Sequence, residues 1–336
     1  MKTPDKPVSP LILGTWNFAP NYYNPISQNQ RQKILRTAIT SSILEFDSAY
    51  SYGNGKSEQS LAASINQLVR ENFLSPQEAN KLKISSKAIL KNNLSVTTDI
   101  KKSLYRLNRN SLYTFFVHWP KADKNYKSHF EALVQAKTEG LISKIGVSNF
   151  SLIDLMDIEK ICKIDTVQIG LNLLWLAPLD DIVPYCQEKK IEIQIYSPLA
   201  QGLLSSRLYT HNSILNSTCR LFDDKRTNHL IFLQEPLFSK LHPILLQINK
   251  AALPLSLQEA ALLFLHKLIP DARIVVGAKS ANQLKELVAV FLNSGDVKKE
   301  LAQTQFEELL FLAKKANQTV REVFPEATNI FNHKIL

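Results

Sequence analysis

Eight short apolar runs, each followed by a segment with helical spacing, constrain the fold of this chain more than any other feature. Their centres are continuously apolar, as in "TFFVHW" and "RIVVGA". That pattern is typical of parallel strands covered on both faces rather than of one-sided antiparallel sheets. The expected strands are Leu11–Trp16, Ile43–Ala49, Lys83–Lys87, Thr114–Trp119, Lys144–Asn149, Thr166–Asn172, Ile191–Ser197 and Arg273–Ala278.

The segments between these strands carry helix start signals and one apolar face. Ser151 begins an S-x-x-D sequence and Ser256 an S-x-x-E capping box,. Thr98 or Asp99 is the expected cap of another helix. The apolar face of that helix, at spacings i, i+4 and i+7, is Ile100, Leu104 and Leu107,.

Alternation of strands and helices predicts an α/β fold with a parallel sheet. A doubly wound sheet is the competing arrangement. Eight repeats over about 270 residues, with no G-x-G-x-x-G after a strand, favour a closed (β/α)₈ TIM barrel. We expect one domain over residues 1–336, with the barrel at about 8–292 and a C-terminal helical extension at about 300–336 that includes Gln303–Lys315. Elaborated loops are expected at the C-terminal face, above all Ser205–Leu255.

Composition and segment length limit the class of protein. The chain has 336 residues, of which 45% are hydrophobic and 21% charged, an ordinary globular balance,. The N-terminal "MKTPDKPVSP" is polar and proline-rich, unlike a signal peptide or transit helix. The longest clearly apolar run, Ala260–Leu265, is far shorter than the ~20 residues that cross a bilayer. A cytoplasmic protein without membrane attachment is expected.

Cysteines and net charge indicate neither a metal site nor a nucleic-acid surface. The three cysteines have no metal-ligand spacing,. The net charge of +10 comes from scattered basic residues without a long basic tract. Most such residues lie on solvated helix faces. We expect a general attraction for anionic ligands such as phosphates, and no nucleic-acid partner.

In a barrel, side chains at the carboxyl ends of the strands share one mouth, where catalytic residues lie. Asp47, Lys87 and His118 end three of the expected strands, and Tyr52 follows Asp47 closely. The glycines of "YGNG" would let the loop turn sharply enough for the phenol to reach the barrel axis. Each residue also has a structural interpretation: Asp47 satisfying loop amides, Lys87 extending to solvent, His118 hydrogen-bonded in the core, and the tyrosines lining the rim.

Together the four residues form a coherent chemical set. A free phenol, with a pKa near ~10, is a poor proton donor at neutral pH. A nearby ammonium favours the phenolate and lowers that pKa, and a carboxylate holds the ammonium in place. Asp47, Lys87 and Tyr52 would form such a relay. His118 would hydrogen-bond the oxygen of a bound carbonyl.

At these residues the sequence resembles the aldo-keto reductase family, from Leu11 to about Phe291. The matching strings occur in the family's order. They are "LILGTW", "FDSAYSYGNGKSE", "ISSK", "VHWP", "GVSNF", "VQIGLN", "YSPLAQGLL" and "VVGAKS". The resemblance implies an NAD(P)H-dependent oxidoreductase that reduces an aldehyde or ketone by hydride transfer. Its expected partner is a small-molecule carbonyl substrate.

The resemblance also assigns residues to roles. Tyr52 is the implied general acid, tuned by Asp47 and Lys87, and His118 orients the substrate. The implied substrate pocket is lined by Trp16, Tyr52, His118 and Trp119. The residues implied to bind the cofactor are Thr15, Trp16, Asp47, Ser148, Asn149, Gln168, Tyr196, Ser197, Pro198, Leu199, Gln201, Gly202, Gly277, Lys279, Ser280, Gln283 and Glu286. Among these, Ser148, Asn149 and Gln168 would hold the nicotinamide carboxamide, and Tyr196 would stack on the ring.

The string "AKSANQ" bears on cofactor preference. Ser280 and Gln283 have the spacing of a capping box. Lys279 beside a helix N-terminus is also suited to a phosphate group. In the family this stretch binds the adenosine 2′-phosphate, so NADPH is expected rather than NADH, with NAD kept as the alternative. Gln283, where several branches of the family use arginine, and Leu171 and Leu287 depart from common family residues.

Other functions remain compatible with the sequence. A dehydrogenase would use the same residues to oxidise a sugar or alcohol. A nucleotide-binding regulatory subunit would keep the barrel and lose turnover, although such a module has no need of all four polar residues. The loops expected to set substrate specificity are Pro20–Gln30, Lys121–Lys127 and Ser205–Leu255.

Overall fold

The structure is a computed structural model that describes residues 9–20, 25–90, 96–121, 123, 125–205, 230–291 and 299–331. Contacts divide the chain into two compact units. The first comprises Met1–Gln168, Tyr185–Gln194 and Arg273–Val288, and the second Ile169–Pro184, Ile195–Ala272 and Ala289–Leu336. The single domain expected from the sequence stays a prediction.

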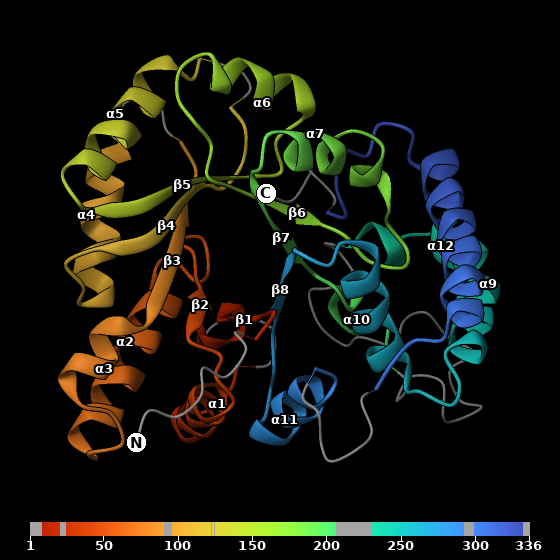
Figure 1. The fold of residues 1–336 in the computed structure, drawn as a ribbon, viewed down its shortest axis with the longest axis horizontal. Coiled ribbons are helices and arrows are strands. Elements are labelled where there is room, and N and C mark those ends of the chain that lie inside the picture. Colours follow the sequence, from red (N-terminus) through yellow and green to blue (C-terminus); the bar gives the residue numbers. More distant parts are fainter. Residues whose placement is uncertain are drawn as a thin grey trace. The chain divides into compact units, whose positions relative to one another are not determined.

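Eight strands of the described chain follow one another in a closed barrel (Figure 1). Every pairing whose register is resolved is parallel. The predicted (β/α)₈ TIM-barrel fold class is therefore confirmed. The strands are β1 (Leu11–Gly14), β2 (Glu45–Asp47), β3 (Lys83–Ala88), β4 (Leu112–Val117), β5 (Ile142–Ser148), β6 (Thr166–Gly170), β7 (Glu192–Tyr196) and β8 (Arg273–Val276). Most end one or two residues before the expected position, because their last residues already turn into the following loop.

Strand register brings the carboxyl ends of the strands to one edge. Gly14 is level with Asp47 in the β1–β2 pair, and Ser148 is level with Gln168 in the β5–β6 pair. In the β4–β5 pair Phe116 lies opposite Gly146, where an added Cβ would be 2.4 Å from the Phe116 ring. Glycine at that position lets the aromatic ring fill the interior.

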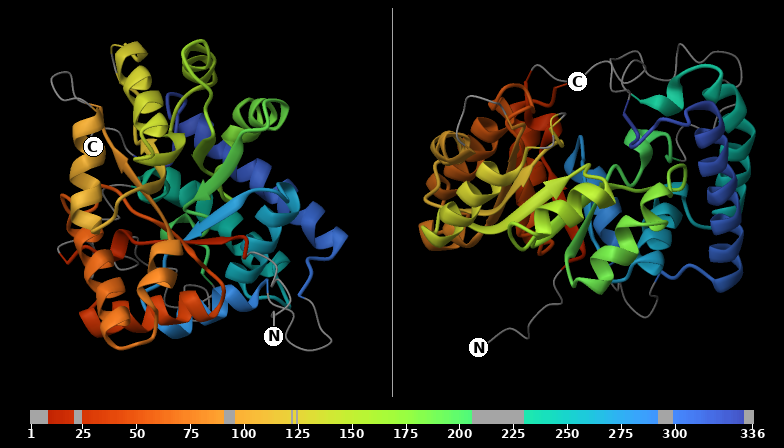
Figure 2. Two further views of the ribbon diagram at one scale, coloured as in Figure 1. Left: turned by 60° about the vertical axis from the view of Figure 1, so that its left-hand side comes forward. Right: turned by 90° about the horizontal axis from the view of Figure 1, so that it is seen from above.

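Helices of the first unit lie outside its strands; α2, α4 and α5 flank β2–β5 in Figures 1 and 2. They are η1 (Trp16–Phe18), α1 (Gln28–Thr40), α2 (Lys56–Arg70), α3 (Pro76–Lys81), α4 (Val96–Leu107), α5 (Lys127–Thr138), α6 (Leu152–Glu159), α7 (Ile182–Glu188, which begins in the second unit) and α11 (Ala281–Ala289).

Most of the predicted start signals are confirmed. Ser151 and Asp154 form a capping box at α6, and Ser256 does the same with Glu259 at the first turn of α10 (Leu257–Leu268). The expected cap of α4 is wrong, because the helix begins at Val96 and the two proposed capping residues lie inside its first turn. The expected apolar face of α4 is buried.

The second unit contains α9 (Leu237–Ala251), α10 and α12 (Gln303–Val323), with the short turns η2 (Ala177–Leu179), η3 (Ala200–Gly202) and η7 (Ile231–Leu233). Helices α9 and α12 lie side by side (Figures 1 and 2). We expected an irregular loop over Ser205–Leu255, of which residues 206–229 lie outside the described part. The α9 portion is instead helical, and Pro243 inside it concealed its apolar periodicity.

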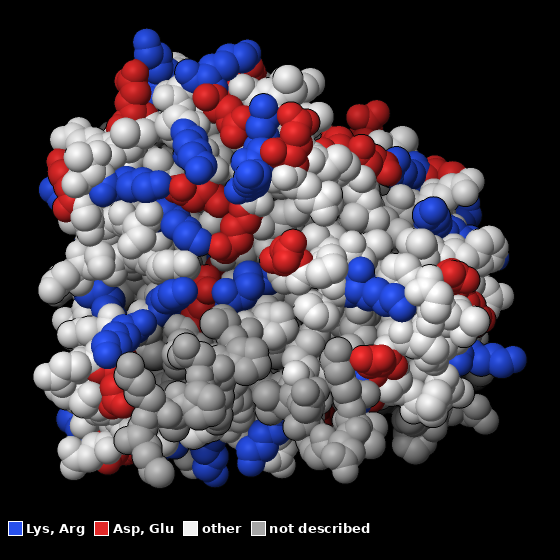
Figure 3. Space-filling view, viewed as in Figure 1, with Lys and Arg blue, Asp and Glu red and all other residues white. Residues whose placement is uncertain are grey.

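Charged residues of both signs are interspersed over the face shown in Figure 3. Several form ion pairs between different elements, among them Lys137–Asp165, Lys144–Glu192 and, within the second unit, Arg321–Asp180. Within the described residues, every helix is too short or too polar to pass through a bilayer.

Candidate active site

The ammonium of Lys87, on β3, is the centre of a polar cluster at the strand ends. It donates to both carboxylate oxygens of Asp47, at 2.7 and 2.6 Å, and to the backbone oxygen of Ser48 at 3.0 Å. The hydroxyl of Tyr52 lies 3.3 Å from Lys87 Nζ. Lys87 is fully buried, and burial lowers its pKa while the Asp47 carboxylate opposes that shift,. The structure thus brings together the three members of the expected relay.

His118, which follows β4, completes the group. Its ring meets that of Tyr52 edge-on, with 5.9 Å between centroids. Its Nδ1 lies 3.1 Å from the hydroxyl of Ser51. Burial, followed by the positive charge of Lys87, holds the pKa of His118 well below its usual value, so the ring is neutral at pH 7,. Sequence reasoning missed Ser51, whose only signal is its place between two tyrosines.

The structure separates the two candidate phenols. Tyr52 lies against the ammonium, with Lys87 Nζ 5.1 Å from its ring centroid. The guanidinium of Arg106 instead lies over the ring of Tyr50, with Arg106 Cζ 5.0 Å from the ring centroid. The Tyr50 residue is partly exposed to solvent. Of the two tyrosines, Tyr52 is therefore the one whose hydroxyl lies beside the Lys87 ammonium.

The loop that carries Tyr52 depends on its glycines. Gly53, Asn54 and Gly55 all have left-handed backbone angles, with φ of 68°, 55° and 83°. A Cβ on Gly53 would lie 2.9 Å from Ala19 Cβ, and one on Gly55 would lie 2.6 Å from Arg106 Cδ. Side chains at either glycine would meet both a strained conformation and a steric clash. The sharp turn expected from "YGNG" is present.

Polar side chains on β6 and at the end of β5 contact Asp47 and His118. The Gln168 amide donates to Asp47 Oδ1 at 3.0 Å and to Gln194 Oε1 at 3.1 Å. The Asn149 amide donates to the Ser148 hydroxyl at 3.0 Å and to the His118 backbone oxygen at 3.1 Å. Three residues expected to hold the nicotinamide carboxamide therefore form one strip beside the cluster. Gln194, in the interior of β7, was not found from the sequence.

Two tryptophans flank the cluster. The Trp16 ring lies 6.0 Å from that of Tyr52, and the Trp119 ring stacks on His118 at 6.0 Å and 27°. The four residues expected to form the substrate pocket are thus neighbours. Thr15 is fully buried, and its hydroxyl donates to the Asp47 backbone oxygen and pairs with Ser57. The Thr15 side chain therefore holds the loop after β1 in place.

In the second unit, the residues after β7 form a compact turn. Ser197, Ala200 and Gln201 have left-handed backbone angles, and the Ser197 backbone oxygen accepts from the Asn172 amide at 3.1 Å. Pro198, Leu199 and Gly202 belong to the same turn, in which the Gly202 amide donates to the Leu199 backbone oxygen at 2.8 Å. Ser197, Pro198, Leu199, Gln201 and Gly202 of this turn are among the residues expected to bind the cofactor.

Tyr196, at the end of β7, stacks on Phe331, with 6.0 Å and 12° between the rings. An added Cβ on Gly170 would lie 2.9 Å from the Tyr196 hydroxyl, so glycine there makes room for the phenol. Burial raises the pKa of Tyr196 above its usual value. The stacking by Phe331 had no signal in the sequence.

The start of α11 carries the last expected cofactor residues. The Gln283 amide nitrogen of the backbone donates to Ser280 Oγ at 3.1 Å, while the Gln283 side chain accepts from the backbone of Lys279 at 2.7 Å. Ser280 therefore caps the helix as expected, and only the return hydrogen bond of the Gln283 side chain is shifted by one residue, to the backbone of Lys279. Lys279, Gly277 and Glu286 are exposed on this segment.

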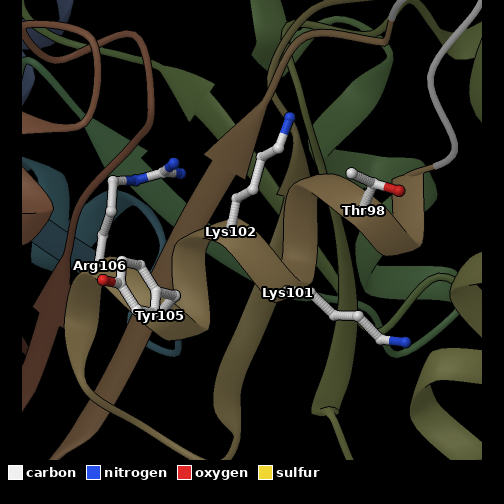
Figure 4. A pocket seen from close by; sticks show the side chains of 5 residues that line it. All are labelled: Thr98, Lys101, Lys102, Tyr105 and Arg106. Carbon is white, nitrogen blue, oxygen red and sulfur yellow. The ribbon is translucent and has the colours of Figure 1, made fainter.

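A hollow of about 290 Å³ lies on α4 (Figure 4). All of its lining side chains come from that one helix. They are Thr98, Lys101, Lys102, Tyr105 and Arg106. The hollow therefore does not contain the residues of the polar cluster.

Comparisons with known proteins give matches over most of the chain. The model of the Aldo/keto reductase family matches residues 10–306. The aldo-keto reductase YhdN of Bacillus subtilis is 25% identical over 298 residues, which cover 86% of this chain and 88% of that protein. The NADH-specific methylglyoxal reductase of Escherichia coli is 24% identical over 61% of this chain and 68% of its own length. The solved structure of the glycerol dehydrogenase AKR11B4 from Gluconobacter oxydans has a TM-score of 0.73, with 22% identity over 97% of this chain and 96% of that one.

Proposed function

Because the chain belongs to the aldo/keto reductase family, we propose that Tyr52 is the general acid with which it reduces an aldehyde or ketone. The chain is an NAD(P)H-dependent carbonyl oxidoreductase. The observation that carries the assignment is the position of the Tyr52 hydroxyl, 3.3 Å from an ammonium that Asp47 holds by two hydrogen bonds.

The proton step follows from this geometry. The nicotinamide supplies a hydride to the carbonyl carbon when the cofactor is bound. Tyr52 gives its proton to the carbonyl oxygen, and the Lys87 ammonium stabilises the phenolate that remains. Asp47 keeps the ammonium in place and opposes the effect of burial on its charge. In the reverse direction, the Tyr52 phenolate takes the proton from the hydroxyl of an alcohol that is being oxidised.

His118 would orient the carbonyl. Its lowered pKa keeps the imidazole neutral, so it carries one ring proton,. A Ser51 hydroxyl that donates to Nδ1 leaves that proton on Nε2, where it can be donated to the carbonyl oxygen,. Trp16 and Trp119 would be the apolar walls of the pocket.

The residues beside the cluster fit a nicotinamide cofactor. Ser148, Asn149 and Gln168 offer hydroxyl and amide groups in one strip next to Asp47, which suits a carboxamide,. In the second unit, Tyr196 offers a ring face for stacking. The turn that follows Tyr196 offers backbone amides for hydrogen bonds to the cofactor. Lys279, exposed before α11, favours the additional phosphate of NADPH over NADH,.

Loss of NADPH absorbance with a panel of aldehydes tests the assignment. We expect turnover by the native chain and a loss of at least ~100-fold in Tyr52→Phe, the size typical of general acid catalysis. Tyr50→Phe is the matched control and should retain activity. NADPH binding without turnover in the native chain, or a loss confined to Tyr50→Phe, would overturn the proposal.

A further inference from the structure

Glu58 is a buried carboxylate outside the catalytic cluster. It is the third residue of α2, and its side chain has no exposed surface. Its Oε1 accepts a hydrogen bond of 2.6 Å from the Ser86 hydroxyl, and its Oε2 forms an ion pair with Arg106. Burying a carboxylate costs free energy even when it is paired, and replacing a whole buried ion pair with apolar residues of similar volume is often neutral or stabilising. The charge therefore calls for a reason other than stability.

Arg106 connects this carboxylate to the loop that carries Tyr52. Its guanidinium donates to Ser103 at 3.1 Å and lies over the ring of Tyr50. Its Cδ fills the space that a side chain at Gly55 would need. Arg106 thus binds Glu58 while packing against both ends of the Tyr50–Gly55 segment.

The charge of Glu58 also affects Lys87, whose side chain lies on the opposite face of β3. Successive residues of a strand point to opposite faces, so Ser86 holds Glu58 on the face opposite to the Lys87 side chain. The backbone oxygen of Lys87 accepts from the Tyr50 amide at 2.9 Å, which ties the loop to the same strand. The charge of Glu58, like that of Asp47, raises the pKa of Lys87 against the effect of burial.

We propose that Glu58 is a positioning residue of this reductase: anchored by Ser86 and Arg106, it holds the Tyr52 loop against β3 and places a buried negative charge across that strand from Lys87. The proposal rests on the proposed role of Tyr52 as general acid. It predicts an effect on the pH profile that a purely structural contact would not produce.

Glu58→Gln removes the charge and keeps the size of the side chain. Reduction needs a charged Lys87, and loss of the Glu58 charge removes one of the interactions that raise the pKa of Lys87 against the effect of burial,. The alkaline limb of the kcat profile should therefore move to lower pH by at least ~0.5 unit. At neutral pH kcat should fall at least ~10-fold, while KM for NADPH changes less than ~3-fold.

Two variants serve as controls. Glu45→Gln is the matched control, because Glu45 is also a buried carboxylate paired with an arginine, Arg273. Glu45 is the first residue of β2, at the opposite end of that strand from Asp47. It should lower Tm and leave the alkaline limb unchanged. Glu58→Asp keeps the charge and should keep the limb within ~0.2 unit of the native position.

A native pH profile and kcat in Glu58→Gln would overturn the proposal, as would a lower kcat with an unmoved limb. If that variant is not recovered folded, Ser86→Ala decides: a kcat at least ~3-fold lower at unchanged Tm supports the proposal, and native kcat overturns it. Tyr52→Phe separates failure of the proposed function from failure of this inference. If Tyr52 is not the general acid, Tyr52→Phe keeps its activity, whatever the result for Glu58→Gln.

Discussion

Replacing Asp47 with asparagine tests the centre of the site, because it removes one charge of a buried pair and keeps the shape. Both Asp47 oxygens accept from Lys87 Nζ, at 2.7 and 2.6 Å, and the lysine has no exposed surface. Leaving one charge of such a pair unpaired costs about 3–5 kcal/mol. For a chain of 336 residues this corresponds to a fall in Tm of about 4–7 °C,.

The double variant Asp47→Asn, Lys87→Met separates the charge from the contact. With both charges gone, the buried site no longer holds an unpaired ion, and most of the lost stability should return. Activity should stay at least ~100-fold below native in both variants, since neither keeps a charged lysine held beside Tyr52. In the double variant we therefore expect Tm to return towards the native value while kcat stays low.

Calorimetry and the NADPH assay measure the two effects on the same samples. The control is Asp180→Asn, which breaks the largely exposed pair with Arg321 and should shift Tm by less than ~1 °C,. The reasoning is refuted if the double variant is as unstable as the single one, or if Asp47→Asn melts at the native temperature. A single variant with native kcat would contradict the role of the ammonium.

Three further results are expected. The lowered pKa of His118 means that it gains a proton only below its usual range, so an NMR titration from about pH 8 to about pH 6 should show a neutral ring; an inflection near 6.5 would contradict this,. Lys279→Met should raise KM for NADPH about 10-fold and leave KM for NADH unchanged, and equal effects on both would count against a phosphate contact. Gly146→Ala places a methyl group 2.4 Å from the Phe116 ring and should cost about 1–3 kcal/mol on denaturant unfolding, whereas native stability would show that the ring has room to move,.

The barrel and the cluster of Asp47, Tyr52, Lys87 and His118 were predictable because both follow from local pattern. Apolar runs of strand length mark the strands, and a parallel barrel gathers their carboxyl ends whatever the loops do. The family resemblance points to Tyr52 as the general acid, and the position of its hydroxyl 3.3 Å from Lys87 Nζ agrees with that expectation.

What escaped prediction depends on contacts between distant segments or on an exception to a local rule. Glu58 has ordinary helix spacing in the sequence, and only its partners on β3 and α4 give it meaning. Gln194 matters because Gln168, 26 residues away, donates to it. Helix α9 was missed because a proline usually ends a helix, while apolar packing of α9 against α12 outweighs the one lost hydrogen bond,.

The start of α2 is fastened to three successive strand ends. The Ser57 hydroxyl donates to the Thr15 backbone oxygen and pairs with Ser48, while Glu58 reaches Ser86. Tyr52 thus lies in a short loop that is hydrogen-bonded to the barrel strands at both ends, through the Tyr50 amide before it and through Ser57 and Glu58 after it. Because both ends of this loop are held by hydrogen bonds to the barrel, the position of the Tyr52 hydroxyl is set by the strands themselves and does not depend on the remaining loops of the rim.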